Sequence, residues 1–184
     1  MDKATIHTDI SLRAAVPGDA LCLSVLAMQV FLDTYATRGI RAAIAREVLQ
    51  NYSEAAFLQA IEDSRTLLCL AEHAGHLVGF AQTTLQTEHA LAPSGSQAEL
   101  LRLYVQEPFT GRHIGSRLLA QAERSAADAG ASVLWLTPWV HNHRARAFYA
   151  RRGYLDFGLT HYVFEGEAHE NRVCGKSLNC LDAV

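Results

Sequence analysis

Residues 98–119 read AELLRLYVQEPFTGRHIGSRLL, and this stretch decides the fold. Its first eight residues are mostly apolar or β-favouring, which predicts a strand over residues 98–105. A loop with Pro108 follows, and from Ile114 onward apolar residues recur at the spacing of an amphipathic helix that Gly130 would cap. The stretch is therefore a strand, a loop and a helix in direct succession.

A second strand and helix come next along the chain. Residues 132–140 form an apolar run that predicts a strand, and residues 142–152 predict a short helix that ends at Gly153. Two strand–helix units in series imply a parallel pair of strands joined by a crossover. Residues 154–164 and 171–178 then predict a closing antiparallel hairpin.

The chain before residue 98 is predicted to combine helices with a strand and a hairpin. The expected elements are a strand at 11–15, helices at 20–31, 40–50 and 54–63 with Asp19 and Ser53 as N-caps, and a hairpin of 66–72 and 77–86 around a turn at 73–76. The fold class is therefore α/β, with a mixed, mostly antiparallel central sheet flanked by helices. We expect one domain over residues 11–184, preceded by an N-terminal extension of residues 1–10.

The composition is that of an ordinary globular domain and argues against some partners. The chain has 184 residues, of which 49% are apolar and 19% charged, and its formal charge of −3 lacks the basic excess of nucleic-acid-binding proteins. The most apolar run, residues 20–32, is shorter than the ~20 residues that span a bilayer. The N-terminus also lacks the pattern of a secretory signal, so we expect a cytoplasmic protein without a membrane segment or a nucleic-acid partner.

Neither a metal site nor a disulfide is predicted. The cysteines form no CxxC pair and no dense framework, so reduced, packed thiols are expected at Cys22, Cys69, Cys174 and Cys180. His141 and His143 lie two residues apart without further ligands nearby, which is a weak pattern for a metal ion. We interpret them as loop residues beside the helix that follows.

The loop before Ile114 has the features of an anion site. Backbone N–H groups at the first turn of a helix have no partner within the helix, and the helix dipole favours negative charge there. Gly111 and Gly115 let a ligand approach the backbone, and Arg112 can add a charge-assisted contact, so a pyrophosphate fits. The glycines alone are weak evidence and favour a plain strand-to-helix turn over a binding loop.

Residues 135–154 read WLTPWVHNHRARAFYARRGY and make the pattern specific. An apolar strand, then Asn-x-x-Ala-x-x-Phe-Tyr, then Gly-Tyr resembles the cofactor-binding strand and helix of the GNAT superfamily of N-acetyltransferases. The Leu-Tyr-Val, Pro and Gly-Arg-His-Ile-Gly-Ser run before it resembles that superfamily's pyrophosphate motif. The resemblance implies the GNAT fold, in which the parallel strands splay around the cofactor, and an acyltransferase that uses acetyl-CoA as co-substrate.

The resemblance also implies which residues contact the coenzyme: Leu103, Tyr104, Val105, Thr110, Gly111, Arg112, His113, Ile114, Gly115, Ser116, Asn142, Tyr149 and Arg152. Asn142 either caps its helix or binds the pantetheine arm, or does both. The chain departs from the family pattern at Thr110 and at His113, where glycine is usual. We expect His113 to adopt an ordinary helical φ and the coenzyme to bind more weakly or in a different arrangement.

Two residues are candidates for proton transfer. An alkylamine has a pKa near ~10.4 and must lose a proton before it attacks the thioester. Glu99 is the candidate base, and strict alternation along the strand would place it on one face with Leu101, Leu103 and Val105. A solvated strand-end glutamate is the alternative. Tyr149 matches the family's tyrosine that protonates the thiolate leaving group, while an aromatic core pair with Phe148 is the alternative role.

The acceptor is expected to be a small cationic amine. Asp33 and Tyr35 match the segment that borders the acceptor groove in this fold, although Asp33 also suits a plain helix terminus or loop. The chain further resembles the bacterial spermidine/spermine N-acetyltransferase type, which makes a polyamine such as spermidine the first candidate. Acetylation of protein N-termini or lysines, and a non-catalytic acyl-CoA sensor, are the alternatives. A homodimer is left open.

Overall fold

The computed structural model describes residues 10–164 and 167–178. Its single sheet has the order β1-β2-β3-β4-β5-β7-β6. The strands are β1 (Ile10–Ala14), β2 (Thr66–His73), β3 (His76–Leu85), β4 (Gln97–Val105), β5 (Val133–Leu136), β6 (Leu155–Phe164) and β7 (Glu167–Ser177). The helices are α1 (Ala20–Tyr35), α2 (Ala42–Asn51), α3 (Glu54–Glu62), α4 (Ile114–Asp128) and α5 (His143–Ala150). Because only β4 and β5 pair in parallel, the predicted mixed, mostly antiparallel α/β architecture is confirmed.

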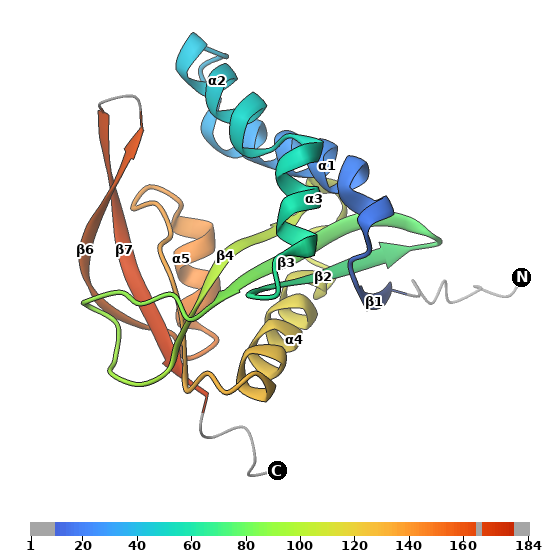
Figure 1. Cartoon of the computed structure of the whole chain (residues 1–184). Coiled ribbons are helices and arrows are strands. Elements are labelled where there is room, and N and C mark those ends of the chain that lie inside the picture. The colour runs from blue at the N-terminus through green and yellow to red at the C-terminus, as the bar shows by residue number, and fades with distance from the viewer. Residues whose placement is uncertain (1–9, 165–166, 179–184) are drawn as a thin grey trace, which may run out of the picture.

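The helices cover the two faces of the sheet. Helices α1 and α3 pack on one face, against β2 and β3, and α4 packs on the other, against β2, β3 and β4 (Figure 1). Each face has its own buried cluster. Leu23, Phe57 and Phe80 belong to the first cluster, and Leu118 and Leu134 belong to the second. The sheet is thus the central layer of the fold, with a hydrophobic core on each of its faces.

Several local features follow directly from the sequence. The β2–β3 turn consists of Ala74 and Gly75, both with positive φ, which is the geometry of a two-residue hairpin turn. The Ser53 hydroxyl accepts a hydrogen bond of 3.2 Å from the Ala56 amide and caps α3 as predicted. Asp19 also stands at the N-cap of α1, but its carboxylate binds Arg13 and the Val16 amide instead of capping the helix.

Some element boundaries differ from the predictions. Helix α1 continues to Tyr35 instead of ending near residue 31, and β1 begins at Ile10, inside the predicted extension. Strand β5 ends at Leu136, since Pro138 has no N–H for a sheet hydrogen bond. Strand β7 starts at Glu167, four residues earlier than predicted.

Strand β4 leaves β5 after three paired residues. The parallel register runs from Gln97 to Glu99, and beyond that point β4 pairs only with β3. Because Gln106 N–H donates to Val78 in β3, alternation turns the N–H groups of Val105 and Leu103 toward the open side. A gap lined by free backbone amides therefore opens between β4 and β5.

The described helices and thiols add two facts. None of the helices within residues 10–164 and 167–178 is long and apolar enough to cross a bilayer. Cys22, Cys69 and Cys174 are free thiols, and Cys22 is exposed, so the expected packing of the thiols is wrong at that position. Cys180 lies outside the described residues.

Candidate active site

The loop before α4 presents a row of backbone amides. The first hydrogen bond of the helix runs from Arg117 N–H to the carbonyl of His113 at 3.0 Å. The N–H groups of residues 111–116 donate to no other described residue. Gly111 has φ +75° and open space where a Cβ would lie, so a ligand can approach the loop closely. The arrangement suits an anion with several acceptor oxygens.

His113 stands at the N-cap of α4 in a left-handed conformation. Its φ is +61° and its ψ is 7°, so the expected ordinary helical φ is wrong. The chain turns sharply from Gly111 into the helix, and this turn requires a positive φ at the position where glycine is usual. The exposed imidazole forms no hydrogen bond that caps the helix.

Helix α5 packs against the start of α4. A Cβ on Gly115 would lie 3.7 Å from the Phe148 ring, and the Arg152 guanidinium stacks over that ring at 4.4 Å. Arg152 also donates a hydrogen bond to the Ser116 hydroxyl. The two sequence motifs, far apart along the chain, therefore meet at the N-terminus of α4.

The N-terminus of α5 is capped by Asn142. Its side-chain oxygen accepts a hydrogen bond of 3.0 Å from the Ala145 amide. The capping role is confirmed, and the contact with a pantetheine arm stays a prediction.

Tyr149 is a buried residue on α5. Its ring meets Phe148 and Tyr154 edge-on, with centroid distances of 5.2 Å and 5.6 Å. Burial, reinforced by Tyr35 and Cys174, raises the pKa of its hydroxyl above the usual range. Tyr149 therefore belongs to the core and also keeps a proton that it can donate.

A β-bulge at Leu101 changes which residues of β4 share a face. Gln82 of β3 pairs with Arg102, but the next residue, Thr83, pairs with Leu100, so Leu101 is the extra residue. The expected common face of Glu99 with Leu103 and Val105 is therefore wrong, since those two side chains pack on the α4 side. Glu99 instead shares the opposite face with Leu101, Arg102 and Tyr104.

A cavity of about 430 Å³ lies on this opposite face, bounded by α1, α2, β4 and the β6–β7 hairpin. Glu99 lines it from β4. Burial raises the pKa of the Glu99 carboxyl, and Arg102 partly counteracts the effect. A carboxylate of this kind is a stronger base than a solvated one and can take a proton from an ammonium group in the cavity.

Aromatic side chains form much of the cavity wall. Phe31 lies 4.7 Å from Tyr35 and 4.9 Å from Tyr52, and Tyr35 lies 5.7 Å from Trp139, measured between ring centroids. The hydroxyl groups of Tyr52 and Tyr104 are 3.3 Å apart. Such faces can hold an apolar chain or a cationic group.

The structure separates the two predicted acceptor residues. Tyr35 lines the cavity, whereas Asp33 is exposed and does not line it. Both lie on α1, where residues two apart point about 200° away from each other. The prediction grouped them because both match the segment that borders the acceptor groove in the family fold.

Three charged residues of the cavity, Arg41, Glu47 and Arg102, were not predicted. Glu47 on α2 lines it and accepts a hydrogen bond of 3.1 Å from the Tyr162 hydroxyl. Arg102 lines it because the bulge turns its side chain to the Glu99 side. Neither Glu47 nor Arg102 carries a local sequence signal, since one depends on the packing of α2 and the other on the bulge.

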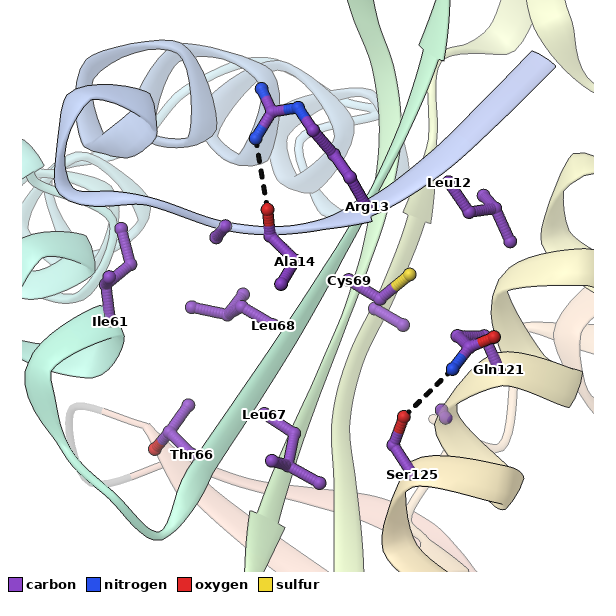
Figure 2. A pocket seen from close by; sticks show the side chains of 13 residues that line it. Leu12, Arg13, Ala14, Ile61, Thr66, Leu67, Leu68, Cys69, Gln121 and Ser125 are labelled. Carbon is purple, nitrogen blue, oxygen red and sulfur yellow. Dashed lines mark hydrogen bonds between the residues drawn. The ribbon is translucent and has the colours of Figure 1, made fainter.

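A second cavity, of about 370 Å³, lies between β1, β2 and α4 (Figure 2). Its wall is mostly aliphatic, and its charged and amide side chains are already paired. Gln121 donates to the Ser125 hydroxyl at 3.1 Å, and Arg13 binds Asp19 and Glu72. None of the predicted site residues lines it, so the candidate active site is the cavity beside Glu99.

Among the residues that the structure describes, no group of three His, Cys, Asp or Glu side chains could hold a metal ion. His141 packs edge-on against Trp139 at 4.9 Å. This contact agrees with the interpretation of His141 as a loop residue, whereas the same interpretation is wrong for His143, which is the first residue of α5.

Comparison with known proteins identifies relatives of both the sequence and the fold. The profile of the acetyltransferase (GNAT) family matches residues 34–154. An uncharacterised N-acetyltransferase of Mycobacterium tuberculosis is 31% identical over 128 residues, which cover 70% of this chain and 77% of the relative. The aminoalkylphosphonate N-acetyltransferase of Salmonella typhimurium is 36% identical over 85 residues, or 46% and 54% of the two chains. The PaiA N-acetyltransferase of Thermoplasma acidophilum, solved with coenzyme A, superposes with a TM-score of 0.72 at 24% identity, covering 92% of this chain and 99% of that one.

Proposed function

Since this chain belongs to the acetyltransferase (GNAT) family, we propose that it transfers the acetyl group of acetyl-CoA directly to the primary amine of a small molecule. One observation carries the proposal. Strand β4 separates the partnerless amides at the start of α4 from the cavity that contains Glu99. A thioester in the gap between β4 and β5 would therefore reach an amine in the cavity.

The residues on the α4 side fit a coenzyme A molecule. The N–H groups of residues 111–116 would bind its pyrophosphate, with Arg112 nearby as a cation. The free N–H groups of Leu103 and Val105 would bind the extended pantetheine arm and polarise the acetyl carbonyl. Acetyl-CoA supplies an activated acyl group, and the chain supplies its orientation and the proton transfers.

Proton transfer would involve one residue on each side of β4. Glu99 would take a proton from the ammonium group of the acceptor, directly or through a water molecule, and the neutral nitrogen would then attack the thioester carbon. As the carbon–sulfur bond breaks, Tyr149 would donate its proton to the thiolate. The raised pKa of the Glu99 carboxyl supports its role as the base. Tyr149 is protonated at neutral pH and therefore has a proton to give to the thiolate.

The acceptor amine would bind between carboxylates and aromatic rings. Glu47 and Glu99 both line the cavity and supply the negative charge that was expected from Asp33. These two carboxylates would attract the ammonium group of the acceptor, and spermidine is one of the candidate amines to be compared. The Salmonella typhimurium relative is named for an acceptor that is likewise a small amine.

The experiment combines coenzyme binding with turnover. Calorimetry with coenzyme A should give saturable binding, and acetyl-CoA with a panel of propylamine, spermidine, amino acids and short peptides should release free thiol. Mass spectrometry of the products would locate the acetyl group. Glu99→Gln should slow turnover, while the exposed loop variant Glu88→Gln, which removes a carboxylate elsewhere, should not.

Two results would contradict the proposal. Saturable coenzyme binding without thiol release from any amine would favour a non-catalytic sensor. Release with peptides alone would favour a protein acetyltransferase.

A further inference from the structure

We propose that Arg102 binds an acidic group of the acceptor, so that the substrate is a zwitterion with a primary amine and a carboxylate or phosphonate. The inference rests on the proposed acetyl transfer and narrows its substrate class. It also predicts that a polyamine, which has no acidic group, is a poor acceptor.

The Arg102 guanidinium is held in place by neutral partners. One terminal nitrogen donates to the Gln82 side-chain oxygen at 2.6 Å, and the other donates to the Asn51 carbonyl at 3.4 Å. Its planar face lies over the Tyr52 ring, 4.8 Å from the centroid. These contacts fix the position of the charge without neutralising it.

Within residues 10–164 and 167–178, Arg102 has no carboxylate in ion-pair contact. Arg13 and Arg172, by contrast, each bind a carboxylate at 2.8 Å or less. A half-buried cation is costly unless an anion or ordered polar groups replace its lost hydration. Because Arg102 lines the cavity, an anionic group of a ligand is the natural partner for its charge.

Two oppositely charged residues of the cavity, Glu99 and Arg102, lie on the same strand, β4. The bulge at Leu101 brings Glu99 and Arg102 to the same face, with a backbone separation of at most about 10 Å for three residues. An acceptor whose ammonium group faces Glu99 would thus present its other end toward Arg102. An acidic group at that end would be attracted, whereas a second ammonium group would be repelled.

The test uses acceptors that differ only at the end away from the amine. The short series is propylamine, 3-aminopropanoic acid and 3-aminopropylphosphonic acid, and an aromatic pair is benzylamine and 4-(aminomethyl)benzoic acid. The ratio of kcat/KM for the acidic member to that for the member without an acidic group is measured for the wild type, Arg102→Gln and Arg102→Lys. Rates are compared at equal concentrations of neutral amine. Arg38→Gln, which removes an exposed cation that does not line the cavity, is the matched control.

The wild type and the control should prefer an acidic member by about tenfold or more, mainly through KM. Arg102→Gln should bring the ratio close to one, and Arg102→Lys should retain part of it. A preference for the amines without an acidic group, or for spermidine, would overturn the inference. An equal loss for all acceptors in Arg102→Gln would also overturn it, because it would mean that Arg102 only supports α2.

A binding measurement separates this inference from the proposed function. Calorimetry with the amines that carry an acidic group and with those that lack one is carried out on protein saturated with coenzyme A, where no turnover is needed. Tighter binding of the acidic amines that disappears in Arg102→Gln would support binding of the acidic group by Arg102, even if no thiol were ever released. Equal binding of both kinds of amine would refute it.

Discussion

His113→Gly tests the left-handed turn at the start of α4. A residue with a Cβ pays about 1–2 kcal/mol to adopt the left-handed region, and glycine adopts it freely. Glycine also makes the unfolded chain more flexible, which offsets about 0.5–1 kcal/mol. The exposed imidazole makes no hydrogen bond with another described residue, so its removal costs little. We therefore expect the free energy of unfolding to rise by about 0.5–1 kcal/mol, which raises Tm by about 1–4 °C in a chain of this size.

His113→Ala is the matched control, because it removes the same imidazole and keeps the Cβ. We expect it to melt a few degrees below His113→Gly and slightly below the wild type, since histidine tolerates the left-handed region better than alanine does. Thermal and urea unfolding followed by circular dichroism would measure the differences. A glycine variant that is no more stable than the alanine variant would refute the left-handed conformation of His113. Ala74→Gly, at φ +51° in the β2–β3 turn, applies the same reasoning at a second site.

Three further substitutions test the site. Tyr149→Phe should lower kcat by about a hundredfold and leave coenzyme A affinity unchanged, as measured by steady-state rates and calorimetry. Glu99→Gln should abolish the rise of kcat/KM with pH, because the base has to lose its proton. Since burial raises the pKa of folded Glu99, the wild type loses stability as pH rises through that pKa, so Glu99→Gln should melt higher at neutral pH and equally at acidic pH. Gly115→Ala should fold normally, since the new methyl group meets Phe148 at an ordinary 3.7 Å, but it should weaken coenzyme A binding in calorimetry because it crowds the amide row.

The sequence was sufficient for the architecture because its signals are local. The hairpin turn at Ala74, the Ser53 cap and the terminating Gly153 are short patterns with a direct effect on the backbone. The order of strands and helices follows from such patterns and from the rules for crossovers. The length of α1 was missed because its last turn has no terminating glycine or proline until Gly39.

The candidate site was only partly predictable, because it depends on pairing between distant segments. The bulge at Leu101 is defined by the register of β4 against β3. No sequence pattern within residues 98–105 predicts it. One extra residue reverses the alternation, so Arg102 joins Glu99, and Val105 moves to the other face. Glu47 was missed for a similar reason, since only the packing of α2 brings it to the cavity.

Strand β4 lies between the proposed coenzyme site and the proposed acceptor cavity, and this position also bears on the order in which the two substrates bind. The amide row at α4 and the cavity beside Glu99 lie on opposite faces of the sheet, as the placement of α1 and α4 in Figure 1 indicates. Two ligands that bind on opposite faces of the sheet need not obstruct each other, so neither has to leave before the other binds. A ternary complex can form by either route, so double-reciprocal plots for the two substrates should intersect instead of running parallel.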